Sequence, residues 1–187
     1  FLLYLEEHLI SKNDLSIDEN FYKPWIYEPG LPDNHPNPTS DKFSNVDRAL
    51  KSWIETQNKK TIVEEYKSDS WSSHEWQYFV RQLPEGLNNE QMMKLDDVFG
   101  FTSSGNSEVL AAWLSHVINN NYQAGFPKLK QFLVNTGRRK FLTPLYKDMI
   151  QTNEGKQMAL DIYKEARPNY HFVSSNSIDE ILDYSEN

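Results

Sequence analysis

Apolar side chains recur at helical spacing along most of this chain, and that periodicity limits which folds it can adopt. The strongest pattern runs through Val109, Trp113 and Val117, which fall on one face of a helix. No stretch shows the sustained apolar–polar alternation that is typical of a half-buried strand. We therefore expect an all-α fold, a two-layer antiparallel helical solenoid-like domain of about eight to ten helices. It would be similar to ARM and HEAT folds, although no fixed-period sequence repeat occurs.

Capping-box spacing marks two predicted helix starts. Ser16 and Glu19 precede a short helix that runs through Tyr27, and Ser72 and Glu75 open a later one. In such a box the Ser hydroxyl and the Glu carboxylate satisfy backbone N–H groups that the first helical turn leaves unpaired.

Glycine and proline mark further predicted boundaries. Gly100 and Gly137 each follow an apolar stripe, as glycines just past a helix end usually do. Pro144 is expected in the opening turn of a helix, and Pro168 is expected to end one. The polar tail beyond these positions is predicted to hold at most one helical turn, over residues 178–182.

Four prolines lie within residues 29–38, and such a run forms neither a helix nor a central strand. We interpret it as a semi-rigid linker. This places a domain boundary between a short segment, residues 1–28, and a helical domain over residues 39–187.

The chain starts inside an apolar helical pattern, without methionine and without a capping residue. One interpretation is a short independent helix, and another is the end of a truncated domain. Truncation predicts that Leu2, Leu5, Leu9, Trp25 and Ile26 are exposed, because the surface that they packed against is missing.

Composition excludes several classes of function. The chain carries 19 Lys and Arg residues against 27 Asp and Glu, a net charge of −8, which is unsuited to a nucleic-acid partner. No apolar run approaches the length of a membrane span, so no membrane partner is expected. The absence of cysteine excludes disulfides and thiolate metal sites. A cytoplasmic location is the default expectation.

No metal or catalytic motif is complete. His74 and Glu75 start an H-E-x-x-H pattern, but Tyr78 occupies its fifth position, so the second imidazole is missing. The five histidines are scattered singly. We predict no metal site, no cofactor and no catalytic residue within this chain. A Ser–His–Asp arrangement assembled by folding remains open, although no motif indicates one.

The run of residues 137–148 contains three consecutive cations, Arg138, Arg139 and Lys140. If the backbone is extended there, Arg138 and Lys140 point to the same side and can approach one anion. The following helix N-terminus would add its partial positive charge. The alternative is a solvated basic loop at a helix junction.

Two segments resemble one enzyme family. The run G-R-x-K-F-x-x-P-L-Y-K-D at residues 137–148 resembles the C-terminal helical domain of leukotriene A4 hydrolase and its aminopeptidase N-like zinc metallopeptidase relatives. The run W-I-Y-E-P-G-L-P at residues 25–32 resembles the segment where the catalytic domain of that family meets the helical domain. The resemblance extends from about Trp25 to Val173.

This resemblance implies a zinc aminopeptidase that removes residues from peptide N-termini, with or without epoxide hydrolysis. Arg138 and Lys140 would bind the free carboxylate of a peptide or fatty-acid substrate. Residues 1–28 would be the end of a catalytic domain that holds the zinc and the catalytic residues. The helical domain would close the active-site cleft, its partner would be its own catalytic domain, and the chain alone would be inactive. A non-enzymatic helical scaffold that binds a protein partner fits the composition equally well.

Overall fold

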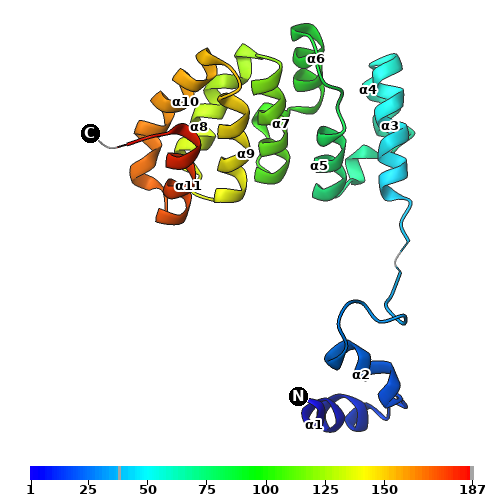
Figure 1. Ribbon diagram of the computed structural model, residues 1–187. Coiled ribbons are helices and arrows are strands. Elements are labelled where there is room, and N and C mark those ends of the chain that lie inside the picture. Colours follow the sequence, from blue (N-terminus) through cyan, green and yellow to red (C-terminus); the bar gives the residue numbers. More distant parts are fainter. Residues whose placement is uncertain (38, 186–187) are drawn as a thin grey trace. The chain divides into compact units, whose positions relative to one another are not determined.

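The computed structural model describes residues 1–37 and 39–185, and every regular element within them is a helix (Figure 1). The predicted all-α fold is therefore confirmed. None of the described helices combines the length and the apolarity that crossing a bilayer requires.

The chain divides into two compact units, Phe1–Ser40 and Asp41–Asn187. The predicted linker includes Pro38, and the predicted helical domain includes Glu186 and Asn187, three residues that lie outside the described part. The assignment of the first segment to a catalytic domain stays a prediction.

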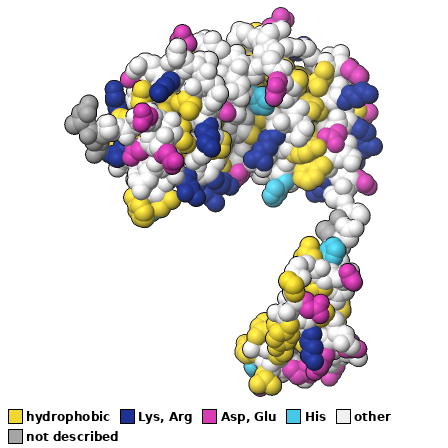
Figure 2. Space-filling model, in the orientation of Figure 1, with side chains coloured by type: hydrophobic (Ala, Val, Ile, Leu, Met, Phe, Trp, Pro, Cys, Tyr) yellow, Lys and Arg dark blue, Asp and Glu magenta, His cyan; other side chains and the backbone are white. Residues whose placement is uncertain are grey.

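The first unit exposes much of its apolar surface. Helix α1 (Leu2–Leu5) continues through a π-helical turn (Glu6–Ile10) and a 3-10 turn (Ser11–Asn13), and α2 spans Glu19–Tyr27. Figure 2 shows hydrophobic side chains gathered on the surface of this unit. The large exposed ones are Phe1, Leu3, Tyr4, Leu9, Leu15, Phe21, Trp25, Ile26, Tyr27 and Leu31.

Three of the five side chains expected to be exposed are exposed. These are Leu9, Trp25 and Ile26, whereas Leu2 and Leu5 are half-buried. The predicted exposure of these apolar side chains is therefore only partly confirmed.

The predicted capping box of Ser16 and Glu19 is wrong. Helix α2 begins after Asp18, whose Oδ1 accepts a hydrogen bond from the Asn20 backbone N–H at 2.8 Å. Aspartate is as good an N-cap as serine, and Asp18 lies directly before the first helical residue.

The second unit contains the remaining α-helices of the described chain. They are α3 (Lys42–Thr56), α4 (Lys59–Glu64), α5 (Ser73–Arg81), α6 (Asn89–Phe99), α7 (Ser107–Asn119), α8 (Phe126–Asn135), α9 (Arg139–Met149), α10 (Asn153–Ala166) and α11 (Phe172–Leu182). Short 3-10 turns join them at Ser68–Ser70, Phe101–Ser103, Gln123–Gly125 and Arg167–Asn169.

Alternate helices of this unit pack side by side. Helix α3 contacts α5, α5 contacts α7, α7 contacts α9, and α9 contacts α11, which makes one row (Figure 1). Helices α8 and α10 contact each other in a second row and also touch α7 and α9. The two rows form the predicted two-layer arrangement.

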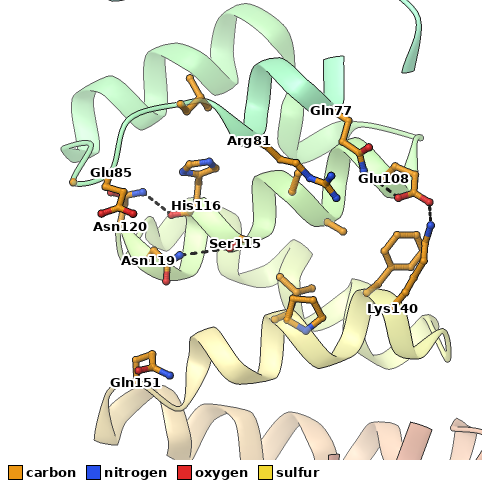
Figure 3. A pocket seen from close by; sticks show the side chains of 17 residues that line it. Gln77, Arg81, Glu85, Glu108, Ser115, His116, Asn119, Asn120, Lys140 and Gln151 are labelled. Atoms are coloured by element: carbon orange, nitrogen blue, oxygen red, sulfur yellow. Dashed lines mark hydrogen bonds and ion pairs between the residues drawn. The ribbon is translucent and has the colours of Figure 1, made fainter. Parts of the chain in front are cut away.

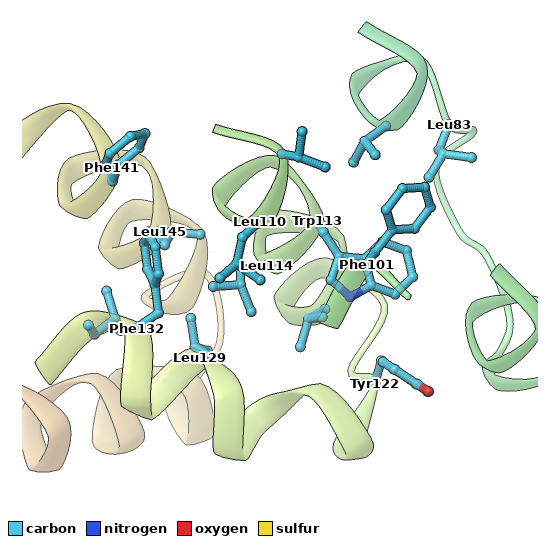
Figure 4. Close-up of a cluster of buried hydrophobic side chains, with 14 of the residues drawn as sticks. Leu83, Phe101, Leu110, Trp113, Leu114, Tyr122, Leu129, Phe132, Phe141 and Leu145 are labelled. Atoms are coloured by element: carbon cyan, nitrogen blue, oxygen red, sulfur yellow. The ribbon is translucent and has the colours of Figure 1, made fainter. Parts of the chain in front are cut away.

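The hydrophobic core extends from α3 to α11, and Figure 4 shows its part around α7. Trp113 and Leu114 of α7 are completely buried, and so is Leu129 of α8. Burying one leucine side chain contributes about 1.5–3 kcal/mol. The Trp113 indole N–H is satisfied by the Thr102 hydroxyl at 2.8 Å, so no donor is lost in the core.

Two local sequence signals are confirmed. Ser72 and Glu75 form a reciprocal capping box at the start of α5. Gly100 ends α6 in the left-handed conformation, with φ of 68°. Both signals depend only on residues within one turn of each other.

One of the two predicted boundaries around α9 is wrong. Helix α8 ends at Asn135 with an extended Thr136 after it, so Gly137 does lie just past a helix end, although it does not have a positive φ. Helix α9 begins at Arg139, so Pro144 lies inside it. Pro144 has no N–H to donate to the carbonyl of Lys140, four residues earlier, so the helix lacks that one bond near its start.

The chain near its C-terminus is more helical than predicted. In place of one turn, α11 runs over eleven residues, from Phe172 to Leu182. Ser174, Ile178 and Leu182 are buried at a spacing of four residues. The Ser174 hydroxyl donates to the Gly137 carbonyl at 2.8 Å and so ties α11 to the segment before α9.

Candidate functional site

Helices α5, α7 and α9 begin along one edge of the second unit. The Asn106 side-chain amide, at the start of α7, donates to the Ser73 hydroxyl at the start of α5, at 2.7 Å. Glu108 in the first turn of α7 forms an ion pair with Lys140 in the first turn of α9. Because helix N-termini carry partial positive charge, this edge favours anions. Figure 2 shows basic side chains gathered where α9 begins.

The Lys140–Glu108 ion pair is held by a third side chain. One Glu108 oxygen contacts Lys140 Nζ, and the other accepts from the Gln77 amide at 3.1 Å (Figure 3). The hydrogen bond from Lys140 is the main cause that lowers the pKa of Glu108. The Lys140 and Glu108 side chains keep 44% and 37% of their surface exposed, so solvent and ligands can reach the pair.

Arg138 and Lys140 lie close to one aromatic ring. The Arg138 Cζ is 5.8 Å from the centre of the Phe141 ring, and Lys140 Nζ is 4.8 Å from it. Both distances are within the range of a cation–π contact. Arg138 is exposed, and no acidic side chain in the described chain forms an ion pair with it.

The expected backbone geometry is only half correct. Arg138 is extended, with φ of −84° and ψ of 110°, but Lys140 is already helical. The two cations are brought together by the first turn of α9 around Phe141, and not by an extended loop. Their binding of a carboxylate stays a prediction.

A groove of about 1080 Å³ runs between α5, α7 and α9 (Figure 3). Lys140 lies at one end, and Asn119 and Gln151 lie at the other. Ala111 and Ala112 of α7 also line it, and their small side chains leave room above that helix.

Arg81 is a second cation in the lining of this groove, beside Lys140, whereas Arg138 does not line it. It lies one helical turn after Gln77 on α5, so both side chains fall on the same face, and both line the groove. Arg81 is exposed, and no carboxylate in the described residues pairs with it. Sequence reasoning missed Arg81, because no local pattern shows that α5 packs near the start of α9.

Ser115, His116 and Asp148 come close together but form no catalytic triad. Ser115 Oγ donates to Asp148, while His116 Nε2 is 2.8 Å from the Val80 carbonyl. Burial lowers the pKa of His116 and raises that of Asp148. A nucleophile needs a base within hydrogen-bonding reach, and the Ser115 hydroxyl is bonded to the carboxylate in place of the imidazole.

No described cluster of three His, Cys, Asp or Glu residues could hold a metal ion. Glu75, the acid of the incomplete zinc motif, accepts hydrogen bonds from the Ser72 backbone and hydroxyl, at 2.9 and 2.7 Å. Glu75 is thus engaged in the helix cap, and the His74–Glu75 pair does not fit a zinc site.

A family model described as "Leukotriene A4 hydrolase, C-terminal" matches residues 71–182, which include α5 to α11 and the basic run. The chain belongs to this family. The resemblance to the C-terminal helical domain of leukotriene A4 hydrolase, seen in residues 137–148, is thereby confirmed.

Curated relatives of this family member are aminopeptidases. Aminopeptidase B of Mus musculus is 25% identical over 164 residues, which cover 84% of this chain and 25% of that protein. The Homo sapiens protein is 24% identical and aligns with 97% of this chain and 29% of its own length. Leucine aminopeptidase 2-1 of Scheffersomyces stipitis is 25% identical, with coverage of 92% and 29%. The chain therefore spans about a quarter to 30% of these relatives.

Solved structures of yeast LTA4 hydrolase share the fold of this family member. One native structure superposes with a TM-score of 0.65 at 19% identity, over 98% of this chain and 31% of that one. A second, from Saccharomyces cerevisiae, has the same TM-score at 20% identity, over 98% and 32%. These likenesses concern the arrangement of helices alone.

Proposed function

We propose that this chain is the C-terminal helical domain of a zinc aminopeptidase, and that Arg138 and Lys140 bind the free carboxylate of its peptide substrate. Family membership and the names of the relatives support the first part. One observation carries the second: two exposed cations lie against Phe141 at the start of α9, and no acidic side chain in the described chain forms an ion pair with Arg138.

The proposed role of this domain is positioning. It closes one side of the active-site cleft and holds the carboxylate end of the peptide. The scissile bond at the other end is then oriented for attack. Arg138 suits this task because its planar guanidinium can form two parallel bonds to a carboxylate, while Lys140 supplies a point charge beside it.

Zinc and the residues that act on the peptide bond would belong to the rest of the catalytic domain whose end is residues 1–28, so this chain alone would be inactive. The exposed apolar side chains of the first unit support packing of this segment against the rest of that domain. Trp25 and Ile26 are 45% and 38% exposed, and the Trp25 indole N–H donates to Asn34 at 2.9 Å, which fixes the ring on the surface.

A helical scaffold that binds another protein would expose the same side chains. An upstream H-E-x-x-H motif in the coding sequence, followed by a distal glutamate, would support the enzyme over the scaffold.

The carboxylate site is tested by comparing Arg138→Ala with Arg139→Ala in the whole protein that contains this chain. A hydrogen bond to a charged group contributes roughly 1.5–3 kcal/mol. Arg138→Ala should therefore lower kcat/KM for a tripeptide by about 10- to 100-fold. The matched control, Arg139→Ala, should have little effect, because the cations that flank Phe141 are Arg138 and Lys140.

An aminoacyl anilide, which has no free carboxylate, serves as the second substrate. Arg138→Ala should change its turnover much less than that of the tripeptide. If both substrates suffer equally, or if both arginine variants behave alike, the basic segment is structural and the assignment is wrong.

A further inference from the structure

Lys140 already has a carboxylate partner in this structure. Glu108 forms an ion pair with it through one oxygen, and the Gln77 amide holds the other oxygen at 3.1 Å. Glu108 therefore already takes one of the three donors of the Lys140 ammonium, and a second carboxylate that binds Lys140 would lie beside it. Arg138 of the same basic run has no such partner among the described residues.

The geometry of the ion pair allows exchange. More than a third of each side chain is exposed, so water can solvate Glu108 if another anion displaces it from Lys140. The Gln77 bond can keep the displaced carboxylate near α5. A ligand carboxylate would then meet an Arg138 that has no ion pair, a Lys140 that Glu108 also attracts, and the negative charge of Glu108 close by.

We propose that Glu108 is a specificity-determining residue, an internal carboxylate that competes with the substrate carboxylate for Lys140. This inference rests on the proposed function of Arg138 and Lys140. With Glu108 present, the three side chains carry a net charge of one positive unit, which suits a ligand with a single carboxylate. A peptide that ends in Asp or Glu brings a second negative charge, which Glu108 repels.

The test is Glu108→Gln in the whole protein, because glutamine removes the charge while it keeps the size of the side chain and one acceptor oxygen. Repulsion between two negative charges about 4 Å apart in water weakens binding by about fivefold, and this is the effect that Glu108 would have on a substrate carboxylate. We expect KM for a tripeptide with a neutral C-terminal residue to fall about fivefold, with kcat little changed. The fall should be larger for a tripeptide that ends in glutamate. The C-terminal amide of the first peptide should show no change.

Glu165→Gln is the matched control. Glu165 forms an ion pair with Lys130 at 2.7 Å, and both side chains are about half exposed, but the pair joins α8 and α10 in the other row. This variant should leave all three KM values unchanged. Glu108→Ala, checked for folding by thermal melting, should shift KM in the same direction as Glu108→Gln.

The possible outcomes separate this inference from the proposed function. If Arg138→Ala selectively impairs carboxylate substrates but Glu108→Gln leaves their KM unchanged or raises it, the site is correct and Glu108 does not compete. Competition is equally ruled out if Glu108→Gln affects the peptide amide as much as the free peptide. If Arg138→Ala shows no preference for carboxylate substrates, the proposed site and this inference are both wrong.

Discussion

Asp179→Asn should destabilise the chain by removing the charge that holds α11 against the end of α10. The Asp179 carboxylate accepts two bonds from Arg167, at 3.0 and 2.9 Å, and one from the Tyr163 hydroxyl at 2.6 Å. The Arg167 and Asp179 side chains are only 26% and 21% exposed, so water replaces these bonds poorly.

The magnitude follows from these contacts. Asparagine keeps the shape and one acceptor oxygen, but it places an NH₂ group opposite a guanidinium N–H. A hydrogen bond to a charged group contributes roughly 1.5–3 kcal/mol, against about 1 kcal/mol for a neutral one. One charged bond is lost and the others are weakened, so we expect the free energy of unfolding to fall by about 3 kcal/mol. For a chain of this size that lowers Tm by roughly 6–12 °C.

The loss of stability in Asp179→Asn should become smaller as the pH falls. The hydrogen bond from Arg167 is the main cause that lowers the pKa of Asp179 in the folded chain. A lowered folded pKa stabilises the fold above the unfolded pKa, about 3.9 for aspartate, and this contribution is lost as the pH falls through the folded value. The difference between wild type and Asp179→Asn should therefore be constant from about pH 7 to 5 and shrink below about pH 4.

The assay is urea unfolding of the full chain, followed by far-UV circular dichroism at several pH values. Asp161→Asn is the control, because its carboxylate lies 3.9 Å from Lys164 and is 62% exposed. It should barely change stability. The reasoning fails if the two variants are equally stable at pH 7, or if the loss at Asp179 persists unchanged below about pH 4.

Two further predictions concern backbone packing and metal binding. Gly155→Ala should destabilise the chain by about 1–3 kcal/mol despite the better helix propensity of alanine, because a Cβ there would lie 2.1 Å from the Met149 carbonyl oxygen. Gly105→Ala, whose Cβ would meet no atom within 4 Å, is the control, and equal urea midpoints for the two variants would contradict the clash. The purified chain should hold no stoichiometric zinc, because no described cluster supplies three ligands. Elemental analysis that finds one tightly held zinc per chain would contradict this.

Local interactions explain what could be predicted from the sequence. The apolar stripe of α7 repeats with the helical period, so its buried face follows from residue order alone. The capping box of Ser72 and Glu75 and the left-handed Gly100 each involve residues within one turn. Arg138 and Lys140 lie together for the same reason, because both are close in sequence to Phe141.

Contacts between helices that are distant in sequence determined the features that local patterns did not predict. The sequence indicated only one turn near residues 178–182, whereas α11 runs over eleven residues and its Ser174 hydroxyl donates to the Gly137 carbonyl. Glu108 reaches Lys140 across 32 positions of sequence. No short-range rule predicts such a pair, because it exists only when alternate helices pack in one row. The sequence therefore determined the helices and the basic run, and tertiary packing determined which charges face each other at the site.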